Sequence, residues 1–356
     1  MPVCKRRDKW SICRLILGYA YWILSHGINP NKPLLIAGSI PFSRLINEGM
    51  VHLIDALHLG TPNVISIGLL QAAPGELVLV DTGPASVFAA VAAGVRKLGF
   101  ELRDVRHILA SHIHLDHTGA AWRWAREVGA KIYVHPNGAP HLVNPSKLLS
   151  SATRIYGDKM NYLWGATEAI PEEQVIAMTD SDFQLGGLRL RAIATPGHAN
   201  HHNAYWIKSQ RILFAGDVAG VRIGSGPAIP PLPPPEINLE LWRDSLEKIR
   251  ALKPASIYIT HFGQVREPTA SLDELERRLA SWSDWIKQRL NEGKSEREII
   301  PEFELFVERE LLAGGATEEE VEIYEKADPA SMSVAGLARY WRKHHPEEVP
   351  AASGAR

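Results

Sequence analysis

The sequence predicts an α/β fold, and three features of its 356 residues support this prediction. Short apolar runs of strand length recur along the chain and end at Gly, Pro, Asp or His. Segments with helical punctuation lie between these runs. From Pro268 onward the character changes, and helical periodicity dominates. We therefore expect strands that alternate with helices, followed by a helical C-terminal region.

The first elements predict a small sheet followed by a helix. The stretch Ala85–Leu98 is rich in alanine, follows Pro84 and is followed by Gly99, which is typical helix punctuation at both ends. Strands and helices then alternate as far as Phe262. Strands are expected before this helix at residues 51–54, 63–70 and 77–80.

The strongest indication of a functional site is a cluster of His112, His114, Asp116 and His117, directly after the apolar run 107–111. Imidazole nitrogen and carboxylate oxygen are ligands that suit zinc and its first-row neighbours. The cluster is expected in a loop at the carboxyl end of a strand, where open α/β sheets place their sites. A histidine-rich surface turn is the alternative. The alternation of the cluster favours a metal site, because two of its members address one point and two address another.

Three later strands also end on residues that can bind metal. The first ends in a Pro-Gly turn and His198, the second in Gly-Asp217, and the third in Thr-His261. A single polar residue at a strand end is more often an ordinary hydrogen-bonded side chain than a ligand. Three of them in order behind the first cluster predict that the same metal site continues there.

These motifs together resemble the metallo-β-lactamase-fold hydrolase superfamily, in particular its two-metal members of the glyoxalase II and lactonase type. The short strand that ends in Asp81-Thr-Gly matches the same pattern. The resemblance implies a four-layer αββα sandwich with an N-terminal extension and a C-terminal helical region. The implied divisions are residues 1–47 for the extension, 48–266 for the catalytic domain, 267–345 for the helical region and 346–356 for a tail.

The resemblance also implies a role for each site residue. One metal would be held by His112, His114 and His198. The other would be held by Asp116, His117 and His261, with Asp217 bridging the two. Asp81 and His202 would not bind metal but would support the ligands from behind.

The implied chemistry is hydrolysis. Two divalent ions, zinc first and iron or manganese second, would share a bridging hydroxide that attacks an ester, lactone or thioester, with phosphotriesters as a promiscuous substrate. Asp116 would orient this hydroxide and pass a proton to the leaving group, which makes Asp116 and Asp217 the catalytic candidates. The chain contains no Gly-x-Ser-x-Gly motif, so covalent serine catalysis has no support.

Two other functions stay open at this point. A mononuclear iron persulfide dioxygenase would use only ligands such as His112, His198 and Asp217. A non-catalytic scaffold on the same fold would have no need for all seven ligands. The substrate is also open, because Gly220 occupies the position where lactonases of this type place a tyrosine. Tyr156 or Tyr205 would have to supply that hydroxyl group.

Composition limits the kinds of molecule that this protein is expected to bind. The net charge of −1 gives no basic field for nucleic acid, so a small-molecule substrate is expected, and a homodimer stays open. Cys4 and Cys13 are the only cysteines, which fits a reducing, cytoplasmic location. The basic and apolar segment 5–24 resembles a targeting signal, but Arg14 interrupts it and leaves a stretch too short to span a bilayer. We expect an amphipathic or core-packing extension without stable membrane insertion.

The C-terminal region is expected to pack beside the mouth of the metal site and to line a pocket for a hydrophobic acyl group. Phe303, Phe306 and Trp341 are expected to be available to that pocket or to a partner chain. The loop 227–235 holds six prolines and either borders the site or serves as a spacer. An apolar stripe of helical period consists of Leu272, Leu275, Leu279, Trp282, Ile286 and Leu290, and capping boxes are expected at Ser271, Ser295 and Thr317. A last helix is expected from Ser333 to Lys343.

Overall fold

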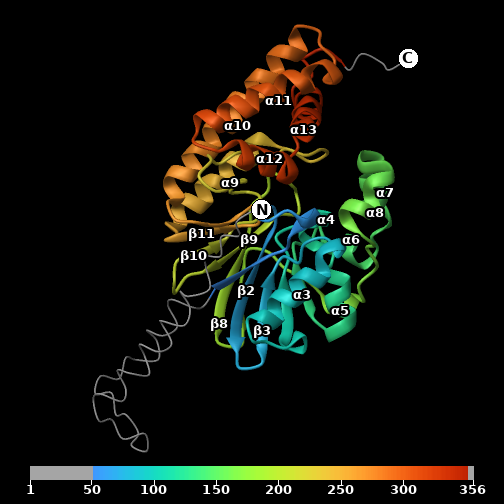
Figure 1. Ribbon diagram of the computed structural model, residues 1–356, viewed down its shortest axis with the longest axis vertical. Coiled ribbons are helices and arrows are strands. Elements are labelled where there is room, and N and C mark those ends of the chain that lie inside the picture. The colour runs from blue at the N-terminus through green and yellow to red at the C-terminus, as the bar shows by residue number, and fades with distance from the viewer. Residues whose placement is uncertain (1–50, 352–356) are drawn as a thin grey trace, which may run out of the picture. The chain divides into compact units, whose positions relative to one another are not determined.

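A computed structural model describes residues 51–351 of the chain (Figure 1). Its centre consists of two six-stranded sheets that lie face to face with helices on their outer sides, which confirms the predicted αββα arrangement. The predicted N-terminal extension, both cysteines and residues 352–356 lie outside the described residues. The predicted division at 266/267 falls between the last strand and the first C-terminal helix, and the division itself stays a prediction.

The first sheet has the strand order β1-β2-β3-β4-β5-β6. Its first three strands are antiparallel, whereas β4, β5 and β6 run parallel to β3, because helical crossovers separate them in the sequence. The strands are β1 (Val51–Asp55), β2 (Ser66–Ala73), β3 (Glu76–Val80), β4 (Val105–Leu109), β5 (Lys131–Val134) and β6 (Val175–Ala177).

The second sheet has the order β12-β11-β10-β9-β8-β7. All of its neighbouring strands are antiparallel except β10 and β11, which helix α9 (Leu239–Leu252) connects. Strands β8, β10 and β11 therefore point in the same direction and end at the same edge. The strands are β7 (Ser181–Leu185), β8 (Leu188–Ala194), β9 (Asn203–Ile207), β10 (Ile212–Phe214), β11 (Ser256–Ile259) and β12 (Gly263–Val265).

The two sheets meet through one apolar layer. Leu70, Val78 and Leu109 of the first sheet and Tyr205 and Phe214 of the second belong to the same buried cluster. The sheets come so close that a Cβ atom on a glycine of β2, at position 68, would lie 3.0 Å from the Phe214 ring. This contact holds the strand ends of both sheets at a common edge.

Helices α3 (Phe88–Lys97) and α5 (Ala121–Val128) cover the first sheet, and α9 and α10 (Pro268–Asn291) cover the second (Figure 1). The helix predicted at 85–98 begins as a 3-10 turn and becomes α-helical at Phe88. The remaining short elements are η1 (His58–Gly60), η2 (Ala85–Val87), η3 (Leu102–Asp104), α4 (Leu115–Thr118), α6 (Ala139–Val143), α7 (Ser146–Tyr156), η4 (Gly157–Lys159), α8 (Met160–Trp164) and η5 (Glu172–Gln174).

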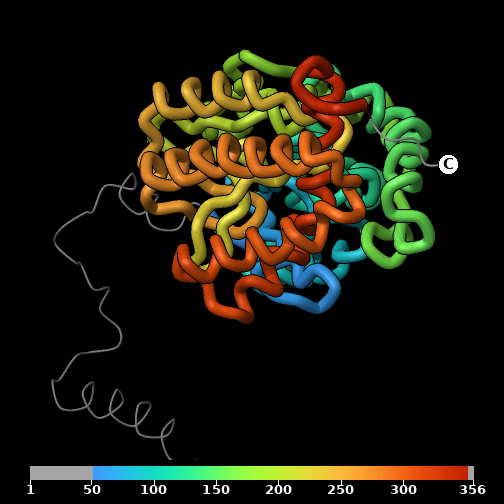
Figure 2. Tube along the Cα trace, turned by 90° about the horizontal axis from the view of Figure 1, so that it is seen from above, coloured from blue at the N-terminus to red at the C-terminus, as the bar shows by residue number. Residues whose placement is uncertain are grey.

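The C-terminal helices are α10 (Pro268–Asn291), α11 (Glu296–Ala313), α12 (Glu318–Ala327) and α13 (Ala330–His344). They lie over the sheets, with the α7–α8 segment to one side of them (Figure 2). All six residues of the predicted apolar stripe are at most 2% exposed on α10. Within residues 51–351, no helix combines the length and the apolar character that a bilayer crossing requires.

Two of the three predicted capping boxes are confirmed, at Ser295 and Thr317, where the backbone N–H of each donates to a glutamate three residues later. The box predicted at Ser271 is wrong, because α10 begins at Pro268 and Ser271 is buried inside the helix. The expectation that Phe303 and Trp341 face a partner or a pocket is also wrong. Both are buried among α10, α11 and α13, because the apolar faces of these helices pack against one another.

Candidate metal centre

The local structure of the cluster follows from where β4 ends. The chain leaves β4 at Leu109 and enters the short helix α4 at Leu115. His112 and His114 therefore lie in the loop, whereas Asp116 and His117 lie on the first turn of the helix. The remaining three candidates, His198, Asp217 and His261, follow β8, β10 and β11 at the edge where these strands end.

His112, His114 and His198 form the first group of possible ligands. Nδ1 of His114 lies 2.9 Å from Nε2 of His112 and 3.0 Å from Nε2 of His198. Burial lowers the pKa of His114 to about 3, and His198 adds to this effect. Burial also lowers the pKa of His112 well below its usual value, helped by His117 and His114. Neutral imidazoles that present their nitrogens to one point are the form in which histidine binds a metal.

Asp116, His117 and His261 form the second group. Oδ2 of Asp116 lies 3.4 Å from Nε2 of His261 and 3.6 Å from Nε2 of His117. Burial opposes the charge of Asp116, but His117 and His261 outweigh it and hold the pKa of this carboxyl below its usual range. The carboxylate is therefore ionised at neutral pH, as a metal ligand must be.

Asp217 lies between the two groups. Its Oδ2 is 3.5 Å from Nε2 of His198, whereas its Oδ1 is 3.3 Å from Nε2 of His117 and 3.7 Å from Nε2 of His261. Burial would raise the pKa of Asp217, but His117, His261 and His198 hold it well below its usual range. Each group thus faces one oxygen of the same ionised carboxylate.

The seven residues fit a divalent cation. Nε2 of His117 and Oδ1 of Asp217 are buried atoms without a hydrogen-bond partner, and buried polar atoms in this state are rare in folded proteins. Both atoms point into the cluster. Within each group of three, the nitrogen and oxygen atoms lie within 4.8 Å of one another, and imidazole nitrogens with carboxylate oxygens are the donor set that zinc, iron and manganese accept.

The outward nitrogens of three of the histidines face acceptors. Nδ1 of His198 donates to the carbonyl oxygen of Pro231 at 2.9 Å, and Nδ1 of His261 donates to that of Val64 at 2.7 Å. A carbonyl oxygen can only accept, so in the neutral ring that binds a metal the proton would lie on Nδ1 and the lone pair of Nε2 would point into the cluster. Nδ1 of His117 lies 2.9 Å from Oδ2 of Asp81.

The two supporting residues expected from the sequence lie against this cluster. Asp81 contacts His117 and also accepts hydrogen bonds from the backbone N–H and the hydroxyl group of Ser111 and from the hydroxyl group of Thr260. His202 accepts a hydrogen bond from the backbone N–H of Asp217 at 3.2 Å. Both residues touch a candidate ligand from behind.

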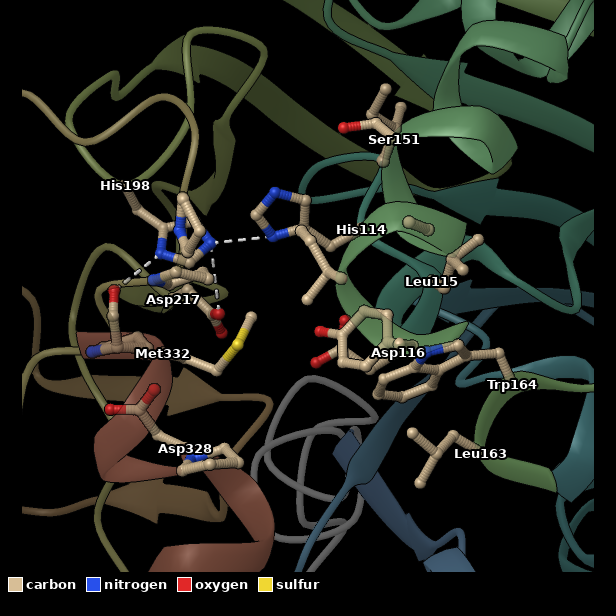
Figure 3. Close-up of a pocket in the computed structure, with 18 of the residues that line it drawn as sticks. His114, Leu115, Asp116, Ser151, Leu163, Trp164, His198, Asp217, Asp328 and Met332 are labelled. Carbon is tan, nitrogen blue, oxygen red and sulfur yellow. Dashed lines mark hydrogen bonds and ion pairs between the residues drawn. The ribbon is translucent and has the colours of Figure 1, made fainter. Parts of the chain in front are cut away.

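A cavity of about 400 Å³ opens onto the cluster (Figure 3). His114, Asp116, His198 and Asp217 line its floor. Its walls come from α7, α8, the end of α12 and the start of α13, from which Met332 faces the cluster. Four of the six prolines in the proline-rich loop line the cavity. The loop therefore borders the site and is not merely a spacer. The C-terminal region likewise contributes to the cavity wall, as expected.

Several functional candidates on the cavity wall have no signature in the sequence. Of the two tyrosines considered from the sequence, Tyr156 lines the cavity, whereas Tyr205 is buried between the sheets and donates to the carbonyl oxygens of Ala110 and Tyr133.

His58, Trp164 and His201 also line the cavity. They come from η1, α8 and the connection between β8 and β9, and no spacing or motif in the sequence indicates that they meet.

Comparison with known proteins places this geometry in a family. Residues 60–261 match the family described as the metallo-beta-lactamase superfamily. A metallo-beta-lactamase fold-containing protein of Sulfurisphaera tokodaii is 31% identical over 193 residues, which cover 53% of this chain and 69% of that protein. A hydroxyacylglutathione hydrolase of Methylobacterium sp. is 29% identical over 199 residues, which cover 55% of this chain and 62% of that enzyme, less than two thirds of its length.

A solved structure agrees with these sequence matches. The crystal structure of an archaeal metallo-beta-lactamase superfamily protein from Sulfolobus tokodaii aligns with a TM-score of 0.59 and 25% identity. The alignment covers 81% of this chain and 98% of that one. The family match spans more than half of the chain and includes all seven clustered residues, with His261 at its last position. This chain belongs to the metallo-beta-lactamase superfamily.

Proposed function

We propose that this chain is a hydrolase that uses two divalent metal ions to cleave an acyl ester, lactone or thioester. The observation that carries the proposal is the position of Asp217, whose two oxygens face two different groups of ligands. One ion would be held by His112, His114 and His198 and the other by Asp116, His117 and His261, with Asp217 shared. Zinc suits this donor set best, and iron or manganese is the alternative.

Two such ions, when bound, would supply a hydroxide nucleophile at neutral pH and would polarise the carbonyl group under attack. The residues of the chain then have two tasks. Asp217 keeps the two groups of ligands together, because its carboxylate belongs to both. Asp116 lines the cavity with its side chain 22% exposed, so the carboxylate oxygen that is not used as a ligand can take up a proton from the attacking water and release it to the leaving group.

The cavity supports an acyl substrate with an apolar chain. Its walls consist mainly of aliphatic, aromatic and proline side chains, among them Leu163, Trp164 and Met332. Asp116 and Asp217 lie at the floor, and charged side chains such as Lys147, Glu236 and Lys326 form a smaller part of the walls than the apolar ones. The apolar chain of a substrate would therefore lie against the walls, while its carbonyl group would lie at the floor. The similarity to a hydroxyacylglutathione hydrolase supports a thioester among the candidate substrates.

The two alternative functions receive less support. A mononuclear iron dioxygenase would leave Asp116, His117 and His261 without a task, although these three converge as closely as the first group. A non-catalytic scaffold would need neither group, nor a cavity that opens onto them.

The proposal is tested by metal analysis combined with an activity screen. We expect the purified full-length chain to contain two divalent ions and to hydrolyse oxoesters, lactones or thioesters, with phosphotriesters and β-lactams tested alongside. Activity should disappear on treatment with a chelator and return on addition of zinc. One iron per chain together with oxygen consumption would establish the dioxygenase instead, and two bound metals without turnover of any substrate would contradict hydrolysis.

A further inference from the structure

His58 lies on the cavity wall and is 4% exposed, although none of the proposed catalytic steps uses it. Among the described residues, no side chain or backbone group forms a hydrogen bond with its ring. Nδ1 is buried without a partner. Nε2 has no partner either but is not among the fully buried atoms, so it is the ring nitrogen that a molecule in the cavity can reach. An imidazole that lines a cavity and has no partner within the protein is available to bond a group of a ligand through this nitrogen.

Aromatic stacking holds this ring in place. The His58 ring lies parallel to the Trp164 ring, with 5.6 Å between their centres and 9° between their planes. The Tyr156 ring packs edge-on against the Trp164 ring, with 5.1 Å between the ring centres. His58 comes from η1 and Trp164 from α8, so packing between two distant segments sets the orientation of the imidazole. A ring fixed in this way can present a hydrogen-bond donor in one direction.

The position of the proton follows from the surroundings. Burial lowers the pKa of His58, so the ring is neutral at pH 7 and carries one proton. Buried N–H groups without an acceptor are rarer in proteins than buried acceptors without a donor. The proton is therefore expected on Nε2, where it faces the cavity, and Nδ1 keeps its lone pair. His58 thus offers an N–H donor between Leu59 and Leu163 on the cavity wall, in addition to the polar side chains elsewhere on that wall, such as Tyr156 and Lys147.

The neighbours of this donor indicate which part of a substrate it meets. Leu59 and Leu163 flank the stacked pair on the cavity wall. Trp164 and Leu163 lie on the side of Asp116, whereas His198 and Met332 lie across the cavity (Figure 3). Apolar flanks suit a carbon chain, and one donor among them suits an oxygen atom carried by that chain.

We infer that His58 determines substrate specificity by donating a hydrogen bond from Nε2 to a hydroxyl or carbonyl oxygen on the acyl chain of the substrate. The inference rests on the proposed hydrolase function and adds a substrate class to it. The substrate is an acyl ester or thioester whose apolar chain carries an oxygen acceptor near the scissile carbonyl group. A plain hydrocarbon chain would leave the donor unsatisfied and would bind less well.

The test compares two acyl thioesters that differ only in one hydroxyl group on the acyl chain. Wild-type enzyme should show a kcat/KM higher by roughly tenfold for the hydroxylated substrate, the size expected of one hydrogen bond. His58→Phe keeps an aromatic ring against Trp164 but removes the donor, so this ratio should fall to about one. His58→Gln keeps a donor and should retain part of the preference. His141→Phe, the same change at another histidine of the cavity wall, should keep the wild-type ratio.

A second measurement does not depend on turnover. The hydroxylated product acid should bind wild-type enzyme more tightly than the plain acid, and His58→Phe should abolish the difference. Equal ratios in wild type and His58→Phe, or equal losses for both substrates, would overturn the role of His58 while leaving hydrolysis intact. A wild-type enzyme that cleaves neither thioester would overturn the proposed function, and this inference with it.

Discussion

The carboxylate of Asp81 lies 2.9 Å from Nδ1 of His117, and both side chains are at most 1% exposed. Asp81 has a left-handed backbone conformation, with a φ of 60°, which turns its side chain from the end of β3 toward the cluster. Burial would lower the pKa of His117, but Asp217, Asp116 and Asp81 raise it well above its usual value. A metal binds the neutral ring, in which the carboxylate of Asp81 would keep the proton on Nδ1 and leave the lone pair of Nε2 facing Asp116 and Asp217.

The first prediction concerns this contact. In Asp81→Asn, the amide can turn its N–H₂ group toward Nδ1 and move the proton of His117 to the wrong nitrogen. We expect metal affinity to fall by about 10- to 100-fold, measured by competition with a coloured chelator. Asp182→Asn, at a side chain that is 77% exposed, is the matched control and should bind metal as the wild type does. Unchanged affinity in Asp81→Asn would contradict the orienting role.

The second prediction separates the shared carboxylate from the proton carrier. Asp217→Ala removes an oxygen from both groups of ligands, so metal content and activity should be lost together. Asp116→Asn keeps an oxygen donor on the second group but cannot hold a proton, so it should retain at least one metal and lose turnover. Metal content by mass spectrometry and kcat on one ester check both variants. Two metals retained in Asp217→Ala would show that this residue does not bridge.

The third prediction concerns the attachment of the C-terminal helices. Leu275 on α10 is fully buried and packs over Gly220, where an added Cβ atom would lie 2.8 Å from its Cδ1. Leu275→Ala should lower the free energy of unfolding by about 2–5 kcal/mol in urea titrations. Leu305→Ala on α11, at a side chain that is 53% exposed, should change it by less than about 0.5 kcal/mol.

Removal of all four C-terminal helices tests their contribution to stability more strongly than a single substitution does. Truncation after Glu267 deletes α10 to α13, including Asp328 and Met332 of the cavity wall. We expect lower stability and an altered substrate preference, while all seven candidate ligands remain in the chain. An unchanged stability and an unchanged specificity profile would show that the C-terminal region is an appendage.

The fourth prediction concerns pH. Asp328 on the cavity wall is 7% exposed, and burial raises the pKa of its carboxyl group well above the usual range, with Asp217 and Glu325 adding to the rise. A group with a raised pKa stabilises the fold while protonated. Its contribution is complete below the ordinary value of about 4 and is lost as the pH rises through the folded-state value.

Asp328→Asn should therefore gain stability relative to wild type as the pH rises from acid to neutral, because the amide stays uncharged throughout. Urea unfolding of both proteins at several pH values, in metal-free buffer, measures this difference. Asp182→Asn should show no such trend. Parallel stability curves for wild type and Asp328→Asn would mean that burial of this carboxyl group does not affect its proton affinity.

Much of the candidate metal centre could be predicted from the sequence, because each ligand lies directly after a strand that its apolar residues indicate. Strand ends in an α/β sheet meet at one edge, so His198, Asp217 and His261 could be assigned to the site of His112 before any coordinates were known. The apolar stripe of α10 was predictable for a similar reason, since helical period alone identifies a buried face.

The tertiary structure alone decided what surrounds the centre. His58 and Trp164 stack although η1 and α8 lie far apart in the chain, and neither residue belongs to a periodic pattern or a motif. Phe303 and Trp341 were predicted as accessible side chains but pack in the core, because the relative placement of α10, α11 and α13 determines which faces are covered. Local patterns specify where elements begin and end and which residues follow them. The walls of a cavity depend on contacts between distant segments, and these contacts leave no local pattern in the sequence.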